Sequence, residues 1–209
     1  MRSLALLVLT SLIAHAAPDT KVLDAWLKRQ TSVTSLEATF TQERRLPSLK
    51  EPVSTPGKLV MQAPDKLRWE LGNPIETLAV SDGTTMTLLQ ASDKSARQVA
   101  NDSPQAKQFS FLGGNALASP EAFRESFEII DARVTSGIHQ YTLQPKERRM
   151  KAKVPWVFLD IDPASNELRA LELEMKDKSR IRTVFTNTKL NGKLAANTFK
   201  ADLTGYTLK

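Results

Sequence analysis

The side chains of this chain that are best suited to chemistry are one histidine and two neighbouring aspartates. His139 follows Ser136 and Gly137 at a predicted hairpin turn, where a histidine could act as general base for a serine nucleophile. No serine lies in the glycine pattern of a nucleophile elbow. A histidine at the edge of a loop is far more often solvated than catalytic. We therefore predict no catalytic residues and expect that the protein is not an enzyme.

Asp160 and Asp162 flank Ile161, so the two carboxylates lie on the same face of a predicted strand. We favour a polar outer face beside a turn over paired-carboxylate chemistry. The other acids show no metal-ligand spacing around the histidine, and the chain has no cysteine. Gly113-Gly114 is too short for a phosphate loop and indicates a helix end. We predict no metal site and no cofactor.

The charge of the chain is moderately basic, at +6, and its cations are mostly dispersed. Two interpretations of one local cluster stay open: a solvated hairpin loop, or a docking patch for an acidic partner or anionic headgroups. We expect no nucleic-acid binding, because no aromatic side chains interleave with the basic residues. The cluster comprises Lys146, Arg148, Arg149, Lys151 and Lys153.

The first 17 residues have the pattern of a secretory signal peptide. A basic start, Met1-Arg2, precedes the apolar run from Leu4 to Ile13 and the small-x-small site Ala14-His15-Ala16. The run is too short to span a bilayer as a mature helix. We expect cleavage after Ala16 or Ala17 and a soluble exported product. No lipid anchor is expected, since no cysteine follows this site.

Because these residues offer little for catalysis, the elements that shape apolar surface matter most. Leu36, Ala38 and Phe40 alternate with polar residues, which indicates a strand with one apolar face. The segment 47–56 holds three prolines and is predicted to be a loop. Gly57 is predicted to open the strand that follows.

Turn signals divide the next segment into further antiparallel strands. Pro64-Asp65 and Gly72-Asn73-Pro74 bound a strand at 66–70. Asp82-Gly83 lies between two apolar runs within 77–89, a strong hairpin signal.

Helical patterns occur at two places. Asp19 is a plausible N-cap for a first helix, on which Trp26 and Leu27 share an apolar face. That helix could either pack on a sheet or partly close a lipid cavity. Ser119 and Pro120 form a second helix start, as N-cap and first helical residue.

The second half of the chain predicts a meandering antiparallel sheet. No repeat and no linker divides the chain, so we predict a signal peptide at 1–17 and one domain at 18–209. The expected fold is mainly β with helices (α+β): a curved antiparallel sheet forms an incomplete barrel, with short helices on its concave face. The strand-like runs are 127–134, 138–144, 154–162, 167–175, 181–190 and a short tail near 199–208.

The order and spacing of the residues in the first half resemble the periplasmic lipoprotein carrier family (LolA-like). The resemblance covers nearly all of the chain after residue 17 and is most specific in the first hundred residues. The residues that carry it are Phe40-Thr41-Gln42, Gly57, Pro64, Arg68-Trp69, Pro74 and Ser81-Asp82-Gly83.

The resemblance implies a concave apolar face that acyl chains fill, at about 0.8 kcal/mol per buried methylene. It also implies helices that act as a lid, for which Trp26, Leu27, Phe109 and Leu112 are the candidates. On sequence alone, each candidate lining residue could equally be plain core. The lining candidates are Phe40, Leu59, Met61, Leu67, Trp69, Leu78, Val80, Met86 and Leu88.

The chain departs from the family pattern at two places. Family members typically carry an arginine just before the proline that corresponds to Pro64, where it takes part in lid closure; this chain has Ala63 there. Thr87-Leu88-Leu89 stands where members usually carry an aromatic pair. Arg68 is our gating candidate, predicted to hold the helices over the pocket through backbone carbonyls. The alternative is a surface residue paired with an acid such as Glu70 or Glu76.

The resemblance implies a soluble, monomeric periplasmic carrier. It would take lipoproteins from an inner-membrane ABC exporter to an outer-membrane acceptor. Two alternatives stay open: a divergent carrier of another amphiphile, such as a glycolipid or an acylated product, or a sensor or interaction domain of the same fold in the envelope.

Overall fold

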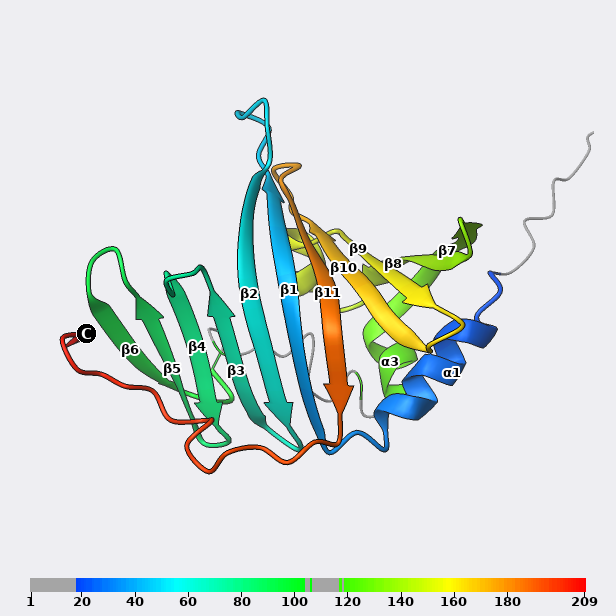
Figure 1. Ribbon diagram of the computed structural model, residues 1–209. Helices are drawn as coiled ribbons and strands as arrows, with labels where there is room; N and C mark the ends of the chain where they lie inside the picture. Colours follow the sequence, from blue (N-terminus) through cyan, green and yellow to red (C-terminus); the bar gives the residue numbers. More distant parts are fainter. Residues whose placement is uncertain (1–17, 104–105, 107–116, 118) are drawn as a thin grey trace, which may run out of the picture.

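The computed structural model describes residues 18–103, 106, 117 and 119–209 (Figure 1). The predicted signal peptide, Gly113-Gly114 and the lid candidates Phe109 and Leu112 lie outside the described residues. Within the described part, no helix is both long enough and apolar enough to cross a membrane.

A single curved sheet of twelve strands forms the body of the protein (Figure 1). Its order is β12-β6-β5-β4-β3-β2-β1-β11-β10-β9-β8-β7, so β12 and β7 are the two outermost strands of the described sheet and the barrel is incomplete, as predicted. All neighbours are antiparallel except β12 and β6. The strands are β1 (Ser35–Arg45), β2 (Val53–Gln62), β3 (Lys66–Leu71), β4 (Thr77–Asp82), β5 (Thr85–Gln90), β6 (Ser95–Ala100), β7 (Phe127–Thr135), β8 (Ile138–Pro145), β9 (Trp156–Asp162), β10 (Glu167–Glu174), β11 (Arg180–Leu190) and β12 (Thr207–Leu208).

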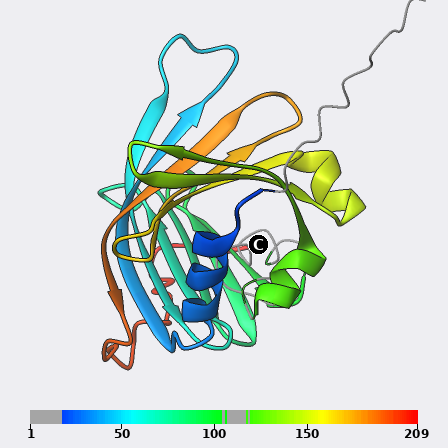
Figure 2. The ribbon, with the colours of Figure 1, turned by 90° about the vertical axis from the view of Figure 1, so that its right-hand side faces the viewer.

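Helices α1 (Lys21–Gln30) and α3 (Pro120–Ser126) lie inside the curve of the sheet, which we call the concave face (Figure 2). The predicted start of α3 is confirmed, because the Ser119 hydroxyl accepts the N–H of Ala122 at 3.1 Å. At α1 the N-cap position is Thr20, one residue after the predicted Asp19.

A third helix, α4 (Arg148–Lys153), replaces the hairpin loop that was one interpretation of the basic cluster. The Glu147 carboxylate caps it by accepting the N–H groups of Arg149 at 2.9 Å and Met150 at 2.6 Å. Side-chain capping of this kind stabilises even a short helix.

The predicted boundary of β2 was wrong. Instead of opening a strand, Gly57 lies in the middle of β2, which begins at Val53. β2 pairs with β1 along its whole length, starting where Val53 lies opposite Arg44. This pairing extends the strand into the proline-rich segment. The resulting hairpin projects beyond its neighbours (Figure 1, cyan).

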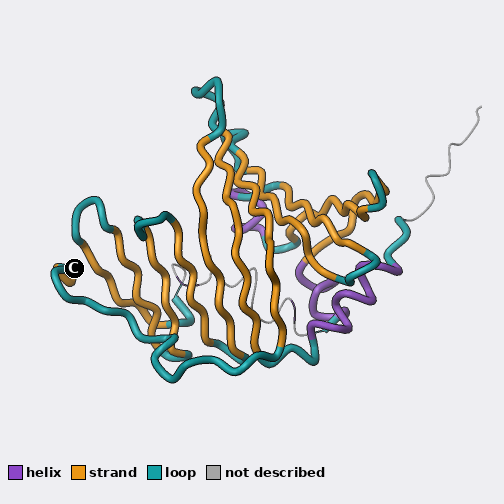
Figure 3. The backbone as a smooth tube through the Cα atoms, in the orientation of Figure 1, coloured by secondary structure: helices purple, strands orange, loops and turns teal. Residues whose placement is uncertain are grey.

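Apolar side chains cover both faces of the sheet. A first core cluster joins the concave face to α1 and α3. A second core cluster lies on the opposite, convex face of β2–β6 and includes Phe199. We call residues 191–206 the C-terminal segment; it runs as a loop past the ends of several strands (Figure 3). Leu194, Ala201, Leu203 and Tyr206 of this segment pack against the second cluster.

Candidate functional site

Three aromatic rings form a continuous apolar surface across the middle of the concave face. The Phe40 ring on β1 lies 4.3 Å from the Trp69 ring on β3, measured between centroids. It also meets Phe185 on β11 edge-on at 6.1 Å. Gly57 on β2 is the register partner of Phe40 and leaves room for its ring. This surface therefore joins the two halves of the sheet.

Seven of the nine predicted lining residues belong to the first core cluster. Phe40, Leu59, Leu67 and Met86 are buried. Met61, Trp69 and Leu88 are only partly buried, and so are their neighbours Leu71 and Val99. The β2–β6 half of the concave face thus carries a row of partly exposed large apolar side chains. The seven are Phe40, Leu59, Met61, Leu67, Trp69, Met86 and Leu88.

The prediction that Leu78 and Val80 line the same face was wrong. Both belong to the second core cluster, with Phe199 of the C-terminal segment. Leu78, Ala79 and Val80 are all buried, because β4 is covered on both sides. A strand covered on both faces loses the alternation that would distinguish its two faces in the sequence.

Helix α1 is fixed to the β8–β10 side of the concave face. Leu23, Trp26 and Leu27 are buried in the first core cluster. The Tyr141 hydroxyl accepts the N–H of Leu23 at 3.2 Å, and burial raises the pKa of Tyr141. Arg29 donates to two carbonyls of the β9–β10 turn, at Ser165 (2.7 Å) and Asn166 (2.9 Å). The lid candidates Trp26 and Leu27 therefore pack within this first core.

An ion pair between α1 and α3 was missed in the sequence. Arg124 on α3 donates to the Asp24 carboxylate on α1, and more weakly to the Thr20 hydroxyl at 3.4 Å. The side chains of Asp24 and Arg124 are about 40% exposed. Two residues 100 positions apart on separate helices give no local signal of their contact.

The prediction that Arg68 holds the helices over the pocket was wrong, since Arg68 lies on the convex face opposite Val60 and Val80 in the register. Its Nε donates to Glu70 at 2.5 Å, as the alternative predicted. Its Nη1 also donates to the carbonyls of Thr198 at 3.3 Å and Lys200 at 3.1 Å. Arg68 thus holds the C-terminal segment and does not replace an arginine at position 63.

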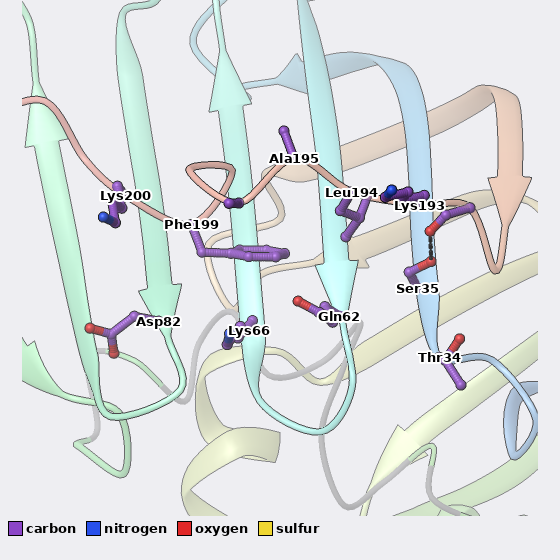
Figure 4. A pocket seen from close by; sticks show the side chains of 12 residues that line it. Thr34, Ser35, Gln62, Lys66, Asp82, Lys193, Leu194, Ala195, Phe199 and Lys200 are labelled. Carbon is purple, nitrogen blue, oxygen red and sulfur yellow. Dashed lines mark hydrogen bonds between the residues drawn. The ribbon is translucent and has the colours of Figure 1, made fainter.

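A cleft of about 470 Å³ lies between the C-terminal segment and the sheet (Figure 4). Lys66, Lys193 and Lys200 line it, together with Asp82 and the Phe199 ring. The cleft is on the face opposite the aromatic surface and is rich in charged side chains. It does not form part of the apolar concave face.

The residues first considered for chemistry have structural partners. Asp160 accepts from Arg182 at 2.5 Å and from Gln140 at 3.1 Å. Asp162 accepts from Arg169 at 2.7 Å, and this bond above all lowers the pKa of Asp162. These contacts confirm a polar face beside a turn.

Within the described residues, His139 and the acidic side chains form neither a catalytic arrangement nor a metal site. His139 is stacked beside Tyr141, with ring centroids 6.4 Å apart, and bonds to neither a serine nor a carboxylate there. The described residues include no group of histidines and acids arranged to hold a metal ion.

Comparisons with known proteins match the chain to a protein family over most of its length. The family model described as outer membrane lipoprotein carrier protein LolA matches residues 31–202. An outer-membrane lipoprotein carrier protein of Pseudomonas fluorescens Pf-5 is 27% identical over 209 residues, covering 97% of this chain and 93% of that protein. One from Dechloromonas aromatica is 28% identical over 198 residues, covering 92% and 86%.

The fold also recurs in a solved structure. A conserved protein of Thermus thermophilus, described as uncharacterized, aligns with a TM-score of 0.54 at 9% identity, covering 91% of this chain and 97% of that one. At such low identity, the similarity demonstrates a shared fold alone.

Proposed function

Because this chain belongs to the family of the outer membrane lipoprotein carrier protein LolA, we propose that it is a periplasmic carrier of lipoproteins. It holds their acyl chains against the concave apolar face and takes them from the inner membrane to the outer membrane. An inner-membrane ABC exporter delivers the cargo and an outer-membrane acceptor receives it. The carrier works as a monomer. An N-terminal signal peptide, later cleaved, directs its export to the periplasm.

The partly exposed apolar row on the concave face is the observation that carries this proposal. Met61, Trp69 and Leu88 lie beside buried neighbours but retain accessible surface. Each methylene of an acyl chain that leaves water there gains about 0.8 kcal/mol. A few acyl chains contain tens of methylenes, so even loose contact would keep a lipid anchor in water.

The helices supply a way to admit and release cargo. Asp24 and Arg124 join α1 to α3 through an ion pair in which both side chains are exposed to solvent. Exposed pairs of this kind contribute only about 0–1 kcal/mol. Such a contact can open at little cost, while Arg29 keeps α1 attached to the β9–β10 turn.

Two matched leucines test which face binds cargo. Leu88 on the concave face and Leu194 on the C-terminal segment are both partly buried, but they pack in different core clusters. Leu88→Asn should weaken binding of a fluorescent fatty-acid analogue about fivefold to tenfold, because apolar contact is lost. Leu194→Asn should leave that affinity unchanged.

Failure of the unmutated protein to bind the analogue saturably would refute the carrier proposal. Native mass spectrometry of protein purified from its own periplasm then identifies the cargo. We expect bound triacylated protein; bound free lipid or glycolipid would instead point to a carrier of another amphiphile. N-terminal sequencing of the same sample should begin after Ala16 or Ala17.

A further inference from the structure

Six cations are clustered on helix α4 and on the segments beside it. We call Lys146, Arg148, Arg149, Lys151, Lys153 and Lys176 the α4 basic surface; all six are exposed. Lys146 donates to the carbonyl of Arg124 at 2.6 Å, and Lys151 to the amide oxygen of Gln144 at 2.5 Å. None of the six forms an ion pair with a carboxylate of the described chain.

On the neighbouring outer face of β9–β11, by contrast, the cations are paired with carboxylates. There, Arg180 contacts the carboxylates of Glu172 and Glu174, and Arg182 contacts those of Glu172 and Asp160. Charges on that face are matched locally and make little net field. The α4 basic surface forms no ion pair within the described chain. Glu147 offsets part of the charge of Arg149 and Lys153, and the remaining positive potential extends into solvent.

The two acids within the α4 basic surface are already engaged. Glu147 accepts from the N–H groups of Arg149 and Met150, and these bonds lower the pKa of Glu147. Asp177 accepts from the hydroxyl of Ser179 at 2.6 Å and from its N–H at 3.0 Å. Both carboxylates stay ionised, because these bonds lower their pKa. The six cations therefore leave an excess of four positive charges on this surface.

The fold holds this surface in a fixed position. Met150 and Val154 pack against the first core cluster and anchor α4. The backbone N–H of Lys176 donates to the carbonyl of Lys153 at 2.9 Å, which joins the β10–β11 turn to the end of α4. In Figure 2, α4 is the yellow-green helix at the upper right, outside the curve that encloses α1.

We propose that the α4 basic surface binds the anionic headgroups of a phospholipid membrane. The centre of a protein interface usually combines arginine with aromatic anchors that fill pockets in the partner. The large apolar side chains that are most exposed in the described chain, including Leu49, Val53 and Val134, all lie on other elements. Clustered charge alone suffices for attraction to an anionic bilayer. This inference does not depend on the nature of the cargo.

Vesicle flotation tests the proposal. Protein purified from its own periplasm should float with vesicles that contain about one-third phosphatidylglycerol at low salt, but not with pure phosphatidylcholine. Binding should disappear at about 0.5 M salt, because screening reaches within about 4 Å of each charge. The double variant Arg148→Gln/Arg149→Gln should bind about 25-fold more weakly, at about fivefold per cation removed.

A matched control variant tests whether membrane binding depends on the α4 basic surface in particular. Lys28→Gln/Arg44→Gln removes two cations from other elements and should lose less than about threefold in affinity. The proposal fails if neutral and anionic vesicles bind equally, if both double variants lose affinity alike, or if an oligoglutamate peptide binds while vesicles do not. Retention of the fatty-acid analogue by Arg148→Gln/Arg149→Gln shows that the variant is folded and that cargo binding is a separate property.

Discussion

The Phe40 ring lies directly over the α-carbon of Gly57 on the neighbouring strand. A Cβ atom at residue 57 would overlap the Phe40 Cζ atom and come within 2.6 Å of the Glu70 carbonyl oxygen. Only a glycine fits beneath the ring, and its place in β2 lets Phe40 on β1 reach Trp69 on β3. The aromatic surface of the concave face depends on this one missing side chain.

Gly57→Ala should destabilise the protein by about 1–3 kcal/mol, because an overpacked core must displace the ring or the backbone. Urea unfolding measures the change. Gly192→Ala is the matched control, since nothing described lies within 4 Å of a Cβ there; its effect should stay within about 0.5 kcal/mol. Adding Phe40→Leu to Gly57→Ala should recover part of the lost stability. An unchanged midpoint for Gly57→Ala would contradict the close contact.

Arg68→Leu should loosen the C-terminal segment and leave α1 unaffected. The change removes two hydrogen bonds, to the carbonyls of Thr198 and Lys200, each worth about 1 kcal/mol. Amide hydrogen exchange in residues 197–206 should become about tenfold faster or more. Arg97→Leu on β6 serves as the control, because Arg97 is exposed and forms no hydrogen bond with that segment within the described chain. Faster exchange in α1 would revive a role for Arg68 in holding the helices.

Asp82 should contribute to the loss of stability in acid. Its carboxylate accepts the N–H groups of Thr85 and Thr84, which lower the pKa of Asp82 below its ordinary value of 3.8. On acidification the unfolded chain therefore binds this proton first. The stabilisation is complete above about pH 5 and declines as the pH falls through 3.8 and then through the folded-state pKa.

Asp82→Asn keeps a hydrogen-bond acceptor but cannot titrate. The free energy of unfolding should consequently fall less steeply below about pH 4 in Asp82→Asn than in the unmutated protein. Urea unfolding at a series of pH values measures the slope. An NMR titration of Asp82 with a midpoint at or above 3.8 would disprove the prediction.

Asp24→Asn should change cargo exchange more than stability. The ion pair with Arg124 is exposed, so its loss should lower the free energy of unfolding by less than about 1 kcal/mol. If α1 and α3 separate to admit cargo, the fatty-acid analogue should dissociate faster from Asp24→Asn in a stopped-flow experiment. Lys28→Gln, a charge change on the same helix, should not alter the rate. Equal dissociation rates in all three proteins would remove the ion pair from the gating mechanism.

The strands of the first half were predictable wherever the sheet has one apolar and one polar face. Leu36, Ala38 and Phe40 alternate with polar residues, and the structure places them together in the first core cluster. The alternation fails at Leu78, Ala79 and Val80, because the C-terminal segment covers the second face of β4. Helix α4 does have a local signal in the sequence, an acidic cap residue followed by good helix formers.

Most of the elements, the order of the strands in the first half and the open, mainly β fold follow from local sequence patterns, since turn chemistry and periodicity act over a few residues. What covers each face of the sheet depends on contacts between distant parts of the chain. Arg68 meets carbonyls 130 and 132 residues later in the chain, and Arg124 meets a helix 100 residues earlier. Neither contact can be predicted from the local sequence pattern, because such pairs depend on the register and curvature of the whole sheet.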